Sequence, residues 1–164
     1  MRAMNEAEPL PPLPPRLVLD TNVVMALWHF DDPGLAALKA FCALRDTTLL
    51  SRADCLDELG RVLAYRQFGI DAARQQLIQE AYLQRVACLP EPDEAAQAAV
   101  EALPRCKDRD DQKFLAVAWL GHADLLLTRD KLVLKLGRKS PFREHLRILT
   151  PEHFEQELRA RLSG

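Results

Sequence analysis

Four acidic residues stand where a carboxylate could take part in chemistry rather than only solvate the surface. Asp20 ends a short apolar, strand-like run, and Asp130 follows a second one. Asp111 opens an apolar-periodic segment, and Glu58 lies inside another. Aspartate is a poor strand residue, so Asp20 in particular needs an explanation other than local structure.

Each of the other three acids also has a structural explanation. Asp111 could favour a helix N-terminus, Asp130 could be an N-cap, and Glu58 could be a surface acid. The joint pattern favours function, because like charges that converge on one crevice repel and need a metal ion or cationic partners. Carboxylate ligands without cysteine suit Mg²⁺ or Mn²⁺, which can activate water for attack on a phosphodiester. We therefore take all four acids as candidate catalytic residues, and Asp20, Asp111 and Asp130 as candidate metal ligands.

Neighbouring polar residues could support such a site. Asn22 and Thr128 could orient the aspartates or bind phosphate. Asp108 and Asp110 precede Asp111 within one acidic stretch, so the choice of ligand among these three stays open.

Alternating strands and helices must position these residues. Strand-like runs occupy residues 16–19, 47–50, 85–89, 125–128 and 147–149. Helical segments are expected over 23–28, 33–44, 52–63 with Ser51 as N-cap, 71–84, 94–103, 111–120 and 131–136, and a last helix begins at 150–152. This alternation predicts an α/β fold, a three-layer α/β/α sandwich with a central parallel sheet. In such sheets the functional crevice lies beyond the carboxyl ends of the strands, where Asp20 and Asp130 fall.

The length and composition fit one globular domain. The chain has 164 residues, 48% hydrophobic and 28% charged, with a net charge of −2. We expect a flexible proline-rich tail over 1–15 and one domain over 16–164. No apolar run reaches about 18 residues, so no transmembrane helix is expected. The four cysteines lack zinc spacing, and we interpret them as buried thiols of a cytoplasmic protein.

Four segments resemble, in order, the acidic motifs of PIN domains. They are residues 19–23 (LDTNV), 56–63 (LDELGRVL), 107–116 (KDRDDQKFLA) and 126–131 (LLTRDK). The amino-acid sequences of these motifs resemble those of the bacterial VapC-like toxins of toxin–antitoxin pairs. The resemblance implies a PIN-like fold and a metal-dependent endoribonuclease whose acidic tetrad is Asp20, Glu58, Asp111 and Asp130. It also implies an RNA substrate and a small antitoxin protein as partner. A housekeeping nuclease in RNA processing and a catalytically silent interaction module remain alternatives.

A basic stretch surrounds Asp130 and could serve such a substrate. Its candidate RNA-binding residues are Arg129, Lys131, Lys135, Arg138 and Lys139. It is either an ordinary solvated face or a basic lip that holds the RNA backbone beside the acidic crevice. Phe142 is the one aromatic residue between 129 and 147, so base stacking is not expected.

Other families that start with a strand ending in aspartate fit less well. A haloacid-dehalogenase-type phosphotransferase would place a second aspartate where Asn22 stands, and a receiver domain would pair adjacent acids at its first strand. The six glycines are spread singly, which excludes a phosphate-binding loop. An antitoxin could place an arginine among the carboxylates and pack on apolar helices around 35–44 and 56–63. The oligomeric state stays open, with a homodimer as one alternative.

Overall fold

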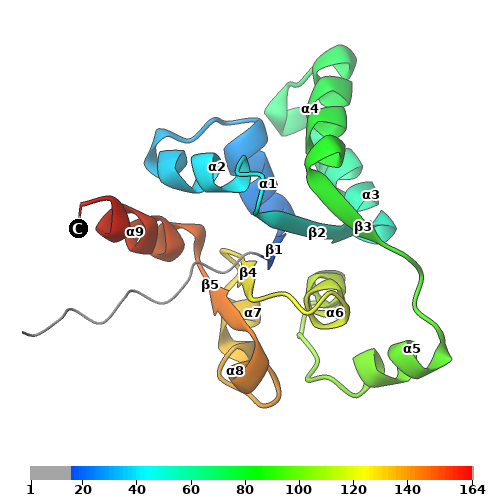
Figure 1. Ribbon diagram of the computed structural model, residues 1–164. Helices are drawn as coiled ribbons and strands as arrows, with labels where there is room; N and C mark the ends of the chain where they lie inside the picture. Colours follow the sequence, from blue (N-terminus) through cyan, green and yellow to red (C-terminus); the bar gives the residue numbers. More distant parts are fainter. Residues whose placement is uncertain (1–15, 164) are drawn as a thin grey trace, which may run out of the picture.

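A computed structural model describes residues 16–163 of the chain, so the expected proline-rich tail over 1–15 lies outside the described residues. Five parallel strands form one sheet in the order β3-β2-β1-β4-β5 (Figure 1). The strands are β1 (Arg16–Leu19), β2 (Thr48–Arg52), β3 (Val86–Leu89), β4 (Leu125–Leu127) and β5 (Arg147–Leu149). All five strands expected from the sequence are therefore present, in the parallel arrangement predicted.

Helices cover both faces of this sheet (Figure 1). The first face carries α1 (Thr21–Trp28), α2 (Ala36–Cys42), α3 (Ala53–Leu63), α4 (Ala72–Arg85) and α9 (Pro151–Leu162). The second face carries α6 (Gln112–Leu120), α7 (Lys131–Leu136) and α8 (Phe142–His145), and α5 (Glu94–Glu101) packs against α6. Three 3₁₀ turns lie at η1 (Pro33–Leu35), η2 (Arg66–Phe68) and η3 (Arg109–Asp111). The three-layer α/β/α sandwich predicted from the sequence is confirmed.

Strands β1 and β4, two of the three inner strands, are buried on both faces, as central strands of a parallel sheet must be. Leu17 and Leu19 pack into the core of the first face, and Val18 between them packs into the core of the second. The three leucines of β4 alternate in the same way and are fully buried. This continuous apolar character explains why both strands were recognisable from sequence.

The strand order creates a topological switch point between β1 and β4. From β1 the chain moves outward through β2 to β3, and it then crosses to the other side of β1 to form β4 and β5. The connections leaving β1 and β4 therefore turn to opposite faces of the sheet, which opens a crevice at the carboxyl ends of these strands.

Two expectations about local structure are wrong, and one short helix was not expected. Ser51 is not an N-cap, because β2 continues through it and pairs Ser51 with Cys88 of β3; Arg52 takes the N-cap position of α3. Cys88 is exposed on this edge strand, whereas Cys42, Cys55 and Cys106 are buried, and all four thiols are free. The four-residue helix α8 was not expected, because one turn is too short to show a helical period.

Glycine ends α6 as expected, and its lack of a side chain matters for packing. A Cβ atom on Gly121 would lie 2.7 Å from the side chain of Leu50 and 3.0 Å from the carbonyl oxygen of Val117. Close approach of the helix end to β2 therefore requires glycine here. Across residues 16–163, no helix combines the length and apolar character needed to cross a membrane.

Candidate active site

Asp20 lies at the switch point, directly after β1. Its backbone N–H donates to the carbonyl oxygen of Leu127 (3.0 Å), which ties it to the end of β4. The carboxylate accepts a hydrogen bond from the hydroxyl of Thr128 (2.7 Å) and is only 5% exposed. Burial raises the pKa of Asp20, and the nearby charges of Glu58 and Asp130 raise it further, against the lowering effect of the Thr128 hydrogen bond.

Thr128 connects Asp20 to Asp130. Its hydroxyl oxygen accepts a hydrogen bond from the backbone N–H of Asp130 (3.0 Å) while the hydroxyl donates to Asp20. The Asp130 side chain caps α7, because one carboxylate oxygen accepts from the N–H of Leu132 (2.8 Å). The structural explanation for Asp130 is thus correct, yet the cap also holds its carboxylate beside the other acids.

Asp111 completes a group of three aspartates. It ends the 3₁₀ turn η3 at the start of α6, and its side chain does not cap its own helix. Burial, a side-chain hydrogen bond with Asp130 and the charge of Asp20 raise the pKa of Asp111 to about 7. A cation bound among these acids would compete with the proton that this raised pKa favours on Asp111.

Asp108 and Asp110 are placed differently from Asp111. Asp108 caps the η3 turn by accepting from the N–H of Asp110 (3.0 Å), and both residues are exposed. Of the three acids that the sequence left open, the structure brings Asp111 to Asp20 and Asp130.

Glu58 reaches the crevice from α3 and is held by two side chains. The hydroxyl of Thr21, the residue after Asp20, donates a hydrogen bond to it. The ammonium of Lys113 lies 2.8 Å from its other oxygen, and both partners of this ion pair are largely buried. Lys113 also donates to the carbonyl oxygen of Asp110 (2.6 Å).

Lys113 and Thr21 were not predicted as site residues. The signal for Thr21 was its place beside Asp20, and the signal for Lys113 was a cation in the first turn of the helix that follows Asp111. Asn22 is exposed in the first turn of α1, and its side chain makes no hydrogen bond to the crevice aspartates in the described structure.

The expected basic lip is partly neutralised by residues that are distant in sequence. Arg129 pairs with Glu152 (2.6 Å) and Asp32 (3.6 Å), so its charge is already engaged. The other four predicted residues are exposed on α7 and the turn that follows it: Lys131, Lys135, Arg138 and Lys139. Lys131 directly follows Asp130, whereas Arg138 and Lys139 lie past the other end of α7, away from Asp130.

The donor chemistry of the crevice fits a hard divalent cation. Asp20, Asp111 and Asp130 offer carboxylate oxygens, and their mutual repulsion is the charge problem that Mg²⁺ or Mn²⁺ would relieve. Within residues 16–163, however, no group of three or more acidic, histidine or cysteine side chains has the geometry to bind one metal ion. Asp20, Asp130 and Glu58 each accept a hydrogen bond, from Thr128, from the N–H of Leu132 and from Lys113 respectively.

Residues 16–132, well over half of the chain, match the sequence model of a protein family described as PIN domain. This chain belongs to the PIN-domain family. The matched region of the PIN domain includes β1, β4 and all four crevice acids, Asp20, Glu58, Asp111 and Asp130. PIN domains are generally nucleases that use divalent metals, which agrees with an acidic crevice at the switch point. Comparison with curated proteins found no match.

Proposed function

We propose that this PIN domain is a metal-dependent endoribonuclease whose acidic residues are Asp20, Glu58, Asp111 and Asp130. The observation that carries the proposal is the hydrogen-bonded chain from Asp20 through Thr128 to Asp130, with Asp111 close enough for the charges of Asp20 and Asp130 to raise its pKa. Carboxyl groups concentrated at one switch point repel one another, and this electrostatic repulsion lowers the stability of the fold. Such destabilising charge clusters are typical of functional sites.

In the proposed mechanism Asp20, Asp111 and Asp130 would hold Mg²⁺ or Mn²⁺, which would supply water activation and stabilisation of negative charge at the phosphodiester. Thr128 fixes the orientation of the Asp20 carboxylate, and the N-cap of α7 fixes Asp130. Glu58 is positioned by Thr21 and Lys113 to orient the attacking water and to accept its proton.

Cleavage of single-stranded RNA tests this proposal. Purified protein should cut a labelled RNA in Mg²⁺ or Mn²⁺, and EDTA should abolish the cleavage. Activity that persists in EDTA would reject the metal mechanism. Cleavage that is confined to one structured ribosomal or transfer RNA precursor, without a growth defect on overexpression, would favour the housekeeping alternative.

The proposal extends to a cytoplasmic toxin with a small antitoxin partner. The toxin assignment is supported by the order and the amino-acid sequences of the four acidic motifs. The cytoplasmic assignment is supported by four free thiols, which are typical of a reducing compartment. The ion pair between Lys113 and Glu58 supports the idea that a cation from a partner could occupy the crevice. An arginine would suit this role, because its guanidinium can bind two carboxylates in a fixed fork.

An apolar groove between α2 and α9 offers such a partner a place to pack. It has a volume of about 200 Å³ and includes Phe41, Leu44 and Leu158. The second helix expected to contribute, α3, is instead packed against α4. Co-expression with the adjacent small open reading frame should yield a stable complex without ribonuclease activity, whereas a stable complex with undiminished cleavage would reject the crevice-blocking model.

A further inference from the structure

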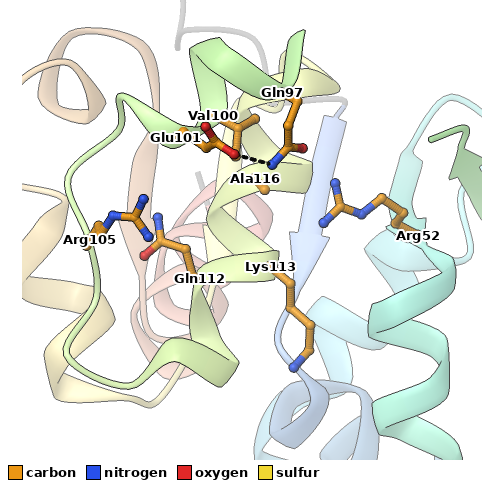
Figure 2. A pocket seen from close by; sticks show the side chains of 8 residues that line it. All are labelled: Arg52, Gln97, Val100, Glu101, Arg105, Gln112, Lys113 and Ala116. Atoms are coloured by element: carbon orange, nitrogen blue, oxygen red, sulfur yellow. Dashed lines mark hydrogen bonds between the residues drawn. The ribbon is translucent and has the colours of Figure 1, made fainter. Parts of the chain in front are cut away.

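A polar cavity lies beside the acidic crevice, on the second face of the sheet (Figure 2). Its volume is about 290 Å³, just below the range of roughly 300–1,000 Å³ for ligand sites. The lining residues are Gln112, Lys113 and Ala116 from α6, Gln97, Val100 and Glu101 from α5, and Arg52 from the end of β2. Arg105, from the loop between α5 and α6, completes the lining, so three cations line one cavity.

The loop that carries Arg105 is fixed to α6. The side-chain oxygen of Gln112 accepts from the N–H of Cys106 (2.7 Å), and its amide nitrogen donates to the carbonyl oxygen of Pro104 (3.2 Å). These two bonds bracket Arg105 and hold its backbone, while its side chain is exposed. Figure 2 shows Arg105 on one side of α6 and Arg52 on the other.

The charged side chains that line the cavity differ in whether they have an ion-pair or hydrogen-bond partner. Arg52 makes two hydrogen bonds to Asp54 (2.9 and 2.7 Å), and Lys113 pairs with Glu58. Glu101 accepts from Gln97 (3.2 Å), as Figure 2 shows. Arg105 has no hydrogen-bond or ion-pair partner among residues 16–163, so it is the cation that an incoming anion would meet first.

A second hollow continues the basic surface at the start of α6. It has a volume of about 410 Å³ and shares Arg105 and Gln112 with the first, and Lys107 and Arg109 also line it. The ammonium of Lys113 lies at Glu58 in the crevice. Arginine and lysine side chains therefore line the surface from the crevice to the loop before α6.

We propose that the cavity between α5 and α6 is a phosphate-binding subsite for the RNA chain next to the bond that is cut, with Arg105 as its main contact. This inference rests on the proposed ribonuclease function and adds a path for the RNA. An extended polyanion fits better than an apolar ligand, because cations line both hollows and no aromatic side chain lines either of them. Gln112 is a positioning residue in this subsite, since it fixes the loop and not the ligand.

Binding measurements without metal test the subsite independently of cleavage. The full-length protein in EDTA is titrated into labelled single-stranded RNA at several salt concentrations. Arg105→Ala should weaken binding about fivefold and lower the slope of log K against log salt by about 0.7, the value for one phosphate contact. Arg74→Ala removes an equal charge from the exposed surface of α4 and should change neither quantity.

A second variant tests the positioning role of Gln112. Gln112→Ala should weaken RNA binding, and combining it with Arg105→Ala should add little further loss, because both changes act through the same contact. Equal effects of Arg105→Ala and Arg74→Ala would overturn the subsite, even if the protein cleaves RNA. An effect specific to Arg105 in a protein that fails to cleave in Mn²⁺ would keep the subsite and reject the nuclease.

Discussion

The hydroxyl of Thr128 donates a 2.7 Å hydrogen bond to the carboxylate of Asp20, although 108 positions separate the two residues in the chain. The same hydroxyl accepts from the N–H of Asp130. One small side chain therefore orients two acids that follow two different strands. Its effect should be visible in both stability and activity.

Replacing this hydroxyl by a methyl group tests its role. Thr128→Val keeps the shape but removes one hydrogen bond from the buried Asp20 carboxylate and leaves the N–H of Asp130 without its partner, so the free energy of unfolding should fall by about 1–2 kcal/mol. Cleavage should fall as well, and Thr128→Ser should restore most of both. Denaturant unfolding and cleavage rates check this; a Val variant with normal activity would show that the hydroxyl does not orient the acids.

Neutralising the buried acid should separate activity from stability. Asp20→Asn should lose ribonuclease activity by orders of magnitude, because a charged oxygen donor is lost from the crevice. The variant should fold at least as well as the wild type, because burial already disfavours the charged form of Asp20. Asp57→Asn, an exposed change on α3, is the matched control for both measurements. Equal loss of activity and thermal stability in Asp20→Asn would make Asp20 a structural residue.

The raised pKa of Asp111 predicts how pH affects the metal-free protein. Its folded value of about 7 lies above the ordinary value of 3.8, so the folded state favours the protonated form. The stability from this proton is complete below the ordinary value and is lost as pH rises through about 7. Relative to Asp111→Asn, the wild type should lose on the order of 1–2 kcal/mol across this range, allowing for solvent screening of a partly exposed carboxyl.

Denaturant unfolding in EDTA at pH 5 and pH 8 measures this difference. Asp110→Asn, a change at the exposed neighbour, should follow the wild type at both values of pH. Mn²⁺ added at pH 8 should stabilise the wild type more than Asp111→Asn, because a divalent ion takes over the role of the proton. A gap between the wild type and Asp111→Asn that stays constant from pH 5 to pH 8 would contradict the assignment.

Packing at the end of α6 predicts an unequal response of two glycines. Gly121→Ala would force its Cβ against Leu50, which is buried, and should cost about 1–3 kcal/mol. Gly69→Ala meets no atom within 4 Å, so its cost of about 1–2 kcal/mol comes from the positive φ of 59° alone. Only Gly121→Ala should also reduce activity, because α6 carries the crevice residues at its start; chemical unfolding and cleavage assays compare the two variants.

The sequence predicted the parts of the site that depend on local pattern. Asp20 and Asp130 follow apolar strands directly, so their place at one edge of a parallel sheet could be inferred from the chain itself. The sequence could not choose among Asp108, Asp110 and Asp111, because the choice depends on how η3 turns into α6. That turn points Asp111 towards Asp130 and leaves the other two exposed.

Contacts between segments that are distant in the chain could not be predicted from the sequence. Lys113 and Glu58 lie 55 positions apart, and no periodicity connects them. Arg129 looked like part of an unpaired basic stretch, because its partners are distant in sequence: Asp32 is the N-cap of η1, and Glu152 lies in α9. Ser51 has the residue type of an N-cap, but the ladder between β2 and β3 extends past it and the backbone hydrogen bonds of the sheet prevail.

The strand order of the sheet has a consequence for protein synthesis. Thr128 is added to the growing chain 108 residues after Asp20, which at roughly 5–20 residues per second takes on the order of ten seconds. During this time β1 has no β4 beside it, and Asp20 stands without its neighbours. On the proposed function, a nascent chain cannot cut RNA, including the message on which its own ribosome is still working, until most of it has been translated.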